Sequence, residues 1–116
     1  MNIKEIQKRL SEFADARDWD QFHSPKNLSM ALSAEAGELL EIFQWLTEKE
    51  SLGIVSSENT LKAAKEEIAD IAIFLLRLAD KLGVDVEQAI LEKIDINEEK
   101  YPIEKCKGKN TKYSDL

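Results

Sequence analysis

The stretch Ala31–Trp45, with the sequence ALSAEAGELLEIFQW, decides the fold because its apolar residues follow the spacing of an amphipathic helix. At 100° per residue, the apolar side chains of this region fall within roughly 60° of one line, the face that a globular helix buries: Leu28, Ala31, Leu32, Leu39, Ile42, Phe43 and Leu46. Glu35 falls near the middle of this stripe and Glu38 lies at its edge. Two carboxylates therefore occupy the side of the helix that should pack.

Composition indicates one folded domain over residues 1–116, since this length supports a single hydrophobic core. Charged residues make up 34% of the chain and apolar residues 43%, a balance typical of globular proteins. The formal net charge of −7 disfavours binding to nucleic acid or to anionic membrane surfaces. We therefore expect neither kind of partner.

The cellular compartment is predicted to be the cytoplasm. Cys106 is the single cysteine, so an internal disulfide and a cysteine-rich zinc site are both excluded. The first residues, MNIKEIQKRLSEF, are charged and amphipathic and do not resemble a signal peptide. The longest nearly apolar run, Ile68–Leu76, is nine residues long and is interrupted by Asp70, too short to cross a bilayer.

Capping signals predict four helices, over about residues 3–17, 25–47, 60–82 and 85–102. Asn2, Ser24 and Asp85 are typical N-caps, Pro25 suits a first helical position, and Gly83 supplies a left-handed stop. The segment EKESLGIVSSEN between the second and third helices is predicted to be a loop. No stretch alternates with period two, so we expect an all-α four-helix bundle.

The third predicted helix is apolar almost all round from Ile68 onward. A helix of this kind is normally buried on several sides. Three neighbouring helices in so small a protein can hardly cover all of these sides. Self-association, as a dimer or a dimer of dimers, is therefore predicted.

Two acidic pairs are the candidate metal ligands: Glu35 with Glu38, and Glu67 with Asp70. Members of each pair are three residues apart and so adjacent on one helix face. Burying ionised carboxylates without a compensating charge costs several kcal/mol each, and no lysine or arginine is expected between these pairs. Oxygen ligands favour Mg²⁺, with Mn²⁺ as a substitute. The alternative is that these residues lie on ordinary solvated helix faces.

Four segments closely resemble the MazG-like all-alpha nucleoside triphosphate pyrophosphohydrolases, in particular the small single-domain branch that includes the dCTP pyrophosphatases. The segments are FHSPKNLSMALSAEAGELLEIFQW, EEIADIAIFLLRLAD, KIDINEEKYP and KYSDL. They occur in the family order, and the resemblance covers about residues 19 to 115.

The resemblance implies a helical tetramer of paired dimers and hydrolysis of a nucleoside triphosphate, usually a deoxynucleotide, between its α and β phosphates. Monophosphate and pyrophosphate are the implied products. It also implies that Mg²⁺ is held by Glu35, Glu38, Glu67 and Asp70. We assign the general base to Glu38, because its place at the edge of the stripe gives it access to solvent.

The resemblance also implies two sets of substrate contacts. The nucleobase pocket is assigned to Trp19, Phe22, His23, Trp45 and Phe74, and the phosphate contacts to Lys93, Asn97 and Tyr101. Without the resemblance, the sequence favours a core role for Trp19, Phe22 and Phe74. His23 is then a loop residue, and Lys93 is equally well explained as a side chain that extends to solvent. The dCTP pyrophosphatases tend to have tyrosine at the position of Phe74.

Other readings of the sequence remain open. Residues 103–116 contain four lysines against two acidic residues, a net charge of +2, so this basic tail is either a flap over an anionic substrate or a frayed end. Alternative substrates are dUTP, dUDP and phosphoribosyl-ATP. A non-enzymatic acidic helical assembly module is the alternative outside enzymology.

Overall fold

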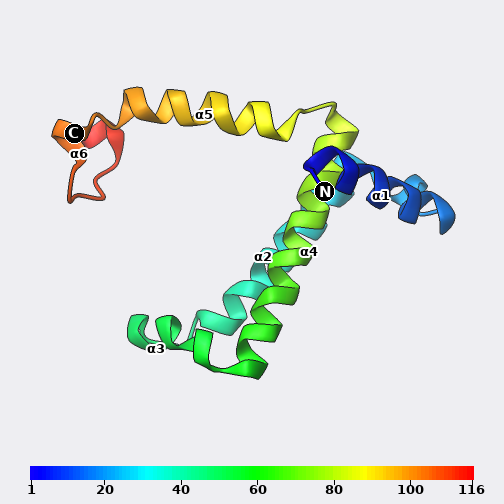
Figure 1. Cartoon of the computed structure of the whole chain (residues 1–116), viewed down its shortest axis with the longest axis horizontal. Coiled ribbons are helices and arrows are strands. Elements are labelled where there is room, and N and C mark those ends of the chain that lie inside the picture. Colours follow the sequence, from blue (N-terminus) through cyan, green and yellow to red (C-terminus); the bar gives the residue numbers. More distant parts are fainter. The chain divides into compact units, whose positions relative to one another are not determined.

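The computed structural model describes residues 1–116, and all of its regular elements are helical (Figure 1). The α-helices are α1 (Ile3–Ala16), α2 (Pro25–Phe43), α3 (Glu48–Gly53), α4 (Glu58–Leu82), α5 (Val86–Lys100) and α6 (Ile103–Cys106). Short 3₁₀ turns lie at Asp20–Phe22, Ile54–Ser56 and Tyr113–Asp115. The predicted all-α class is confirmed.

The chain divides into two compact units, Met1–Gly83 and Val84–Leu116. The first unit contains α1 to α4, and the second contains α5, α6 and the C-terminal residues. The single domain, the four-helix bundle and the dimer or tetramer stay predictions.

The antiparallel pair α2 and α4 forms the body of the first unit, in which the two helices run side by side along most of their length (Figure 1). Leu28 on α2 is only 1% exposed, and Ala64 on α4 is also buried. Helix α1 packs on α4, where the Gln7 side-chain amide donates a hydrogen bond of 3.2 Å to the Leu76 carbonyl. This packing brings one face of α2 against one face of α4.

The apolar stripe predicted from the sequence is the packed face of α2. Every member is buried or half-buried in the structure: Leu28, Ala31, Leu32, Leu39, Ile42, Phe43 and, just beyond the helix end, Leu46. Glu35 is half-buried and Glu38 is exposed, as their positions in the middle and at the edge of the stripe predict.

The predicted caps are confirmed. Side-chain oxygens of Asn2, Ser24 and Asp85 accept hydrogen bonds from backbone N–H groups three residues on, at 2.9, 3.1 and 3.0 Å. Gly83 ends α4 with a φ of 67°, the left-handed conformation that glycine adopts without strain.

The predicted loop between the second and third helices is wrong in part. Helix α2 ends at Phe43, and α3 begins after Thr47, whose extended backbone cannot continue a helix. Thr47 Oγ1 accepts from the Glu50 N–H at 3.1 Å, and Glu50 Oε1 accepts from the Thr47 N–H at 3.0 Å. This reciprocal capping box starts a new short helix where the sequence suggested loop.

The C-terminal tail also contains ordered elements in the second unit, namely α6 and the turn at Tyr113–Asp115. The Tyr113 ring packs edge-to-face on Tyr101, with centroids 6.1 Å apart. The Lys100 ammonium lies 4.6 Å from the centroid of the Tyr113 ring. The end of the chain therefore contacts the end of α5.

The first unit does not bury the whole apolar surface of α4. Ile68 is 57% exposed, and Ile73 and Leu75 are exposed as well. This exposure agrees with a helix that is apolar on several sides. No helix in the structure is both long enough and apolar enough to span a bilayer, and the compartment stays a prediction.

Replacing Gly83 with alanine should lower the free energy of unfolding by about 1 kcal/mol, because a β-carbon disfavours the left-handed backbone. No atom lies within 4 Å of the added carbon, so the loss would come from the backbone alone. Chemical denaturation of the purified variant measures this change.

Gly53→Ala is the matched control, since Gly53 has an ordinary helical φ of −75° and equal space around it. Its stability should be unchanged or slightly higher. Equal losses in both variants would contradict the conformational explanation.

Candidate metal centre and adjoining cavity

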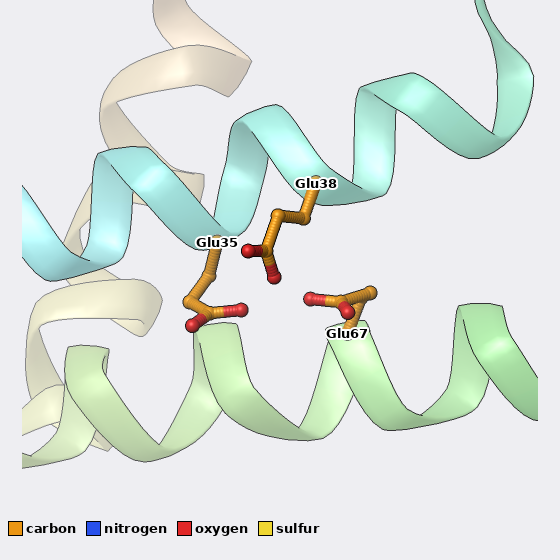
Figure 2. A group of neighbouring side chains, drawn as sticks. All are labelled: Glu35, Glu38 and Glu67. Atoms are coloured by element: carbon orange, nitrogen blue, oxygen red, sulfur yellow. The ribbon is translucent and has the colours of Figure 1, made fainter.

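Three carboxylates converge between α2 and α4. Glu35 and Glu38 project from successive turns of α2, and Glu67 projects toward them from α4 (Figure 2). One oxygen from each side chain lies within 4.8 Å of the others. The predicted convergence of acidic residues from two helices is therefore present for these three.

No positive side chain neutralises this cluster, because none of the ion pairs in the chain involves Glu35, Glu38 or Glu67. Glu35 Oε2 and Glu67 Oε2 are shielded from solvent and accept no hydrogen bond. Buried oxygens without a donor are costly, and a proton or a cation between them removes the cost. The donor set, carboxylate oxygens alone, fits a hard divalent cation.

Proton sharing within the cluster raises the pKa of Glu35 to about 7. The largest cause is the hydrogen bond that a protonated Glu35 makes with Glu67, followed by that with Glu38, by partial burial and by repulsion from both carboxylates. For Glu67, the proton shared with Glu35 acts to lower the pKa, but partial burial and the neighbouring Glu38 and Asp70 raise it overall.

Asp70, the fourth predicted ligand, is not part of this close group. It lies one turn beyond Glu67 on α4, is half-buried, and lines a neighbouring cavity. Its role as a ligand stays a prediction, and its position links the carboxylate cluster to the cavity.

The cavity has a volume of about 240 Å³ and is lined mainly by apolar and aromatic side chains. Its walls are Leu10, Phe13, Ala14, Trp19, His23, Asp70, Ile73, Phe74 and Arg77. Phe13 and Trp19 pack edge-to-face with centroids 5.7 Å apart. Trp19, His23 and Phe74, three residues of the predicted nucleobase pocket, are therefore brought together.

Two other residues of the predicted nucleobase pocket are not brought to this cavity. Phe22 is 60% exposed and Trp45 is 86% exposed, and neither lines it. The predicted phosphate contacts lie on or next to α5 in the second unit, and all three are exposed: Lys93, Asn97 and Tyr101. Their roles stay predictions.

Arg77 is a site residue that sequence reasoning missed. It is only 4% exposed, although it carries a charge, and it lines the cavity. Its guanidinium pairs with Asp20 at 3.2 Å and with Asp80 at 3.9 Å, and it contacts the imidazole of His23. The available signal was an arginine inside an apolar helical run, seven residues after Asp70 and so on the same face.

Asp20 is shared by two cations. Lys81 also donates a hydrogen bond to its Oδ1. The hydrogen bond from Lys81 has the largest effect and lowers the pKa of Asp20. The positive charge of Lys81 and the hydrogen bond and charge of Arg77 act in the same direction, so the pKa stays below its ordinary value although desolvation opposes them. Asp20 therefore stays ionised beside the cavity.

The family model described as MazG-like matches residues 30–116. This range includes all four predicted metal ligands. The chain belongs to the MazG-like family.

This MazG-like chain is also similar to individual proteins along nearly its whole length. It is 43% identical over 114 residues to dCTP pyrophosphatase 1 of Bos taurus, covering 98% of this chain and 68% of the relative. The human dCTP pyrophosphatase 1 is 41% identical over 114 residues, with coverage of 98% and 67%. A pyrophosphatase from Archaeoglobus fulgidus with a crystal structure superposes with a TM-score of 0.79 at 40% identity, covering 85% of this chain and 91% of that one.

The stability of the metal-free MazG-like protein should decrease between about pH 4.5 and pH 7. The pKa of Glu35 is about 7 in the folded protein against an ordinary value of 4.5, so the folded state binds this proton more tightly than the unfolded state. The resulting stabilisation is complete below pH 4.5 and is lost as the pH rises to about 7. Glu35→Gln should flatten this part of the profile of unfolding midpoint against pH.

Added Mn²⁺ should raise the unfolding temperature more at pH 7.5 than at pH 5, since protons compete for the carboxylates. Glu35→Gln should lose most of this gain. Glu41→Gln, an exposed carboxylate of α2 outside the cluster, serves as the control and should keep it. An undiminished gain in Glu35→Gln would place the cation elsewhere.

Proposed function

We propose that this chain is a Mg²⁺-dependent hydrolase that cleaves the α–β phosphoanhydride bond of deoxynucleoside triphosphates, with dCTP as its preferred substrate type. The products are then the monophosphate and pyrophosphate. The observation that carries the proposal is the unneutralised carboxylate cluster of α2 and α4 beside an aromatic cavity that contains Asp70. The enzyme class, a nucleotide pyrophosphohydrolase, is supported by relatives named dCTP pyrophosphatase 1 that match 98% of the chain.

Glu35, Glu38 and Glu67, joined by Asp70, are the residues that would hold Mg²⁺, with Mn²⁺ as a substitute. When bound, the cation supplies charge neutralisation and Lewis acidity at the phosphate oxygens. Glu35 and Glu67 have the shielded oxygens, so they anchor the deeper side of the site. Their geometry is fixed by the packed pair of helices rather than by a loop, which favours precise positioning.

Glu38 is the proposed general base, because it is the exposed member of the cluster and its carboxylate reaches solvent. In the reaction, the oxygen of water forms a bond to the α phosphorus. The bond between this phosphorus and the oxygen that bridges to the β phosphate breaks, and pyrophosphate leaves. The Glu38 carboxylate accepts the proton that the water releases.

The cavity is the proposed site of the nucleobase. The rings of Trp19 and Phe74 offer flat apolar surfaces on which a base can stack, and His23 adds a polar group. Phe74 lacks the hydroxyl of tyrosine, so one potential hydrogen bond to the substrate is missing there. We keep the remaining pocket and phosphate contacts as part of the proposal: Phe22, Trp45, Lys93, Asn97 and Tyr101.

The proposed setting is a homodimer or tetramer in the cytoplasm. The exposed apolar side chains that the first unit leaves on α4 support self-association. Light scattering of the purified protein measures the assembly.

A nucleotide panel tests the activity directly. The purified protein with Mg²⁺ should convert dCTP to dCMP and pyrophosphate faster than the other nucleoside triphosphates, as seen by chromatography. Preference for dUTP, dUDP or phosphoribosyl-ATP would keep the site and change the substrate. Orthophosphate as the first product would overturn α–β cleavage, and no turnover of any nucleotide would favour an assembly module.

Glu38→Gln should lower kcat by about 10²- to 10⁴-fold, because the amide cannot accept the proton of the attacking water. Steady-state kinetics with saturating metal measure the change, with Glu41→Gln as the matched control on the same helix. A variant with a normal kcat would remove Glu38 from the role of base.

A further inference from the structure

The contact between Arg77 and His23 restricts the chemical state of the histidine. Arg77 Nε lies 3.4 Å and Arg77 Nη2 lies 3.2 Å from His23 Nδ1. Two donor groups of one guanidinium therefore approach the same ring nitrogen.

A guanidinium has only donors and stays charged at all ordinary pH values. The nitrogen that it contacts must therefore offer a lone pair. A proton on His23 Nδ1 would place N–H against N–H and would put two positive groups in contact. The arrangement is compatible with one state of the ring, neutral imidazole with its proton on Nε2.

Arg77 is itself held from two sides, so it cannot easily turn away. Its side chain is 5% exposed, and Nη2 also donates to Asp20 Oδ1 at 3.2 Å. Asp80, one turn along α4, lies 3.9 Å from Nη1. Asp20 belongs to the turn that directly precedes His23, so the same short segment supplies the anchor of the guanidinium and the imidazole that it contacts.

The surrounding charges agree with a neutral ring. Partial burial is the largest influence, and the charges of Arg77 and Lys81 add to it, so that the pKa of His23 falls below its ordinary value although Asp20 opposes the change. The other charged groups at this place are Asp80, beside Arg77, and Asp70, which also lines the cavity.

We propose that Arg77, anchored by Asp20, is a positioning residue that fixes His23 as the Nε2–H tautomer, so that the cavity offers one defined hydrogen-bond donor to its ligand. None of the hydrogen bonds within the first unit uses His23 Nε2. The ligand that fits is a planar base that stacks on the aromatic walls and presents a ring nitrogen or carbonyl oxygen to this N–H, as cytosine does with N3 and O2. This assignment of the ligand rests on the proposed function, whereas the tautomer does not.

Nuclear magnetic resonance decides the tautomer without any substrate. His23 is the single histidine of the chain, so ¹⁵N-histidine labelling gives one pair of ring signals. A multiple-bond ¹H–¹⁵N correlation spectrum of the metal-free protein at pH 7 should show a protonated Nε2 and an unprotonated Nδ1. A protonated Nδ1, two averaged nitrogens or a charged ring would each overturn the proposal.

Variants at Arg77 test its part in this state. Arg77→Met should give the averaged signals of a freely exchanging imidazole, and Arg77→Lys, which keeps the charge and one donor, should retain a larger share of the Nε2–H form. Lys81→Met is the control, since Lys81 contacts Asp20 but not His23, and its spectrum should match the parent. Circular dichroism identifies a variant that fails to fold, and the parent spectrum still decides the tautomer. An unchanged tautomer in folded Arg77→Met would show that Arg77 does not set it.

Kinetics test the consequence for the ligand. Arg77→Met should raise the KM for dCTP about tenfold, and Arg77→Lys should raise it by less, while kcat changes by less than about threefold in both, because the imidazole that is no longer held contacts the base and not the reacting phosphates. An unchanged KM would overturn the use of this donor in base recognition. If the parent hydrolyses no nucleotide, the proposed function fails, while the histidine spectrum still confirms or rejects the role of Arg77.

Discussion

Repulsion between carboxylates across the α2–α4 contact is the constraint on which the site depends. The two helices are held together by apolar side chains such as Leu28 and Ala64, and this packing forces Glu35 and Glu67 together with shielded oxygens. Without a positive partner, the folded protein keeps this arrangement by retaining a proton near neutral pH. The hydrophobic energy of the helix pair thus maintains a site that is prepared for a cation.

The cavity beside the cluster is organised by a second electrostatic group of opposite sign. Arg77 and Lys81 share Asp20, and Arg77 contacts His23. Helix α4 contributes to both groups: Glu67 belongs to the acidic cluster and Arg77 to the basic group, and Asp70 lies between them in sequence. In the proposed function, this one helix would contribute cation ligands at one place and the arginine that contacts His23 at another, as a substrate with a phosphate chain and a base requires.

The elements that could be predicted from the sequence are those set by local chemistry. The caps at Asn2, Ser24 and Asp85 and the packed stripe of α2 follow from neighbours in the chain, and Glu35 stood out because it interrupts that stripe. Helix α3 was missed because the Thr47 capping box competes with a continuing helix. Arg77 was missed because its partner Asp20 is 57 residues away in sequence, and the roles of Lys93, Asn97 and Tyr101 depend on contacts that no local pattern specifies.

The contact of Tyr113 with Tyr101 and Lys100 has a practical consequence for work on this protein. Tyr113 lies only three residues before Leu116, so an affinity tag fused after Leu116 would begin close to this ring. Such a fusion would disturb the Tyr113 ring and its contacts with the Tyr101 ring and the Lys100 ammonium. A tag attached at Met1, which is solvent-exposed, would leave the segment after Tyr113 unchanged.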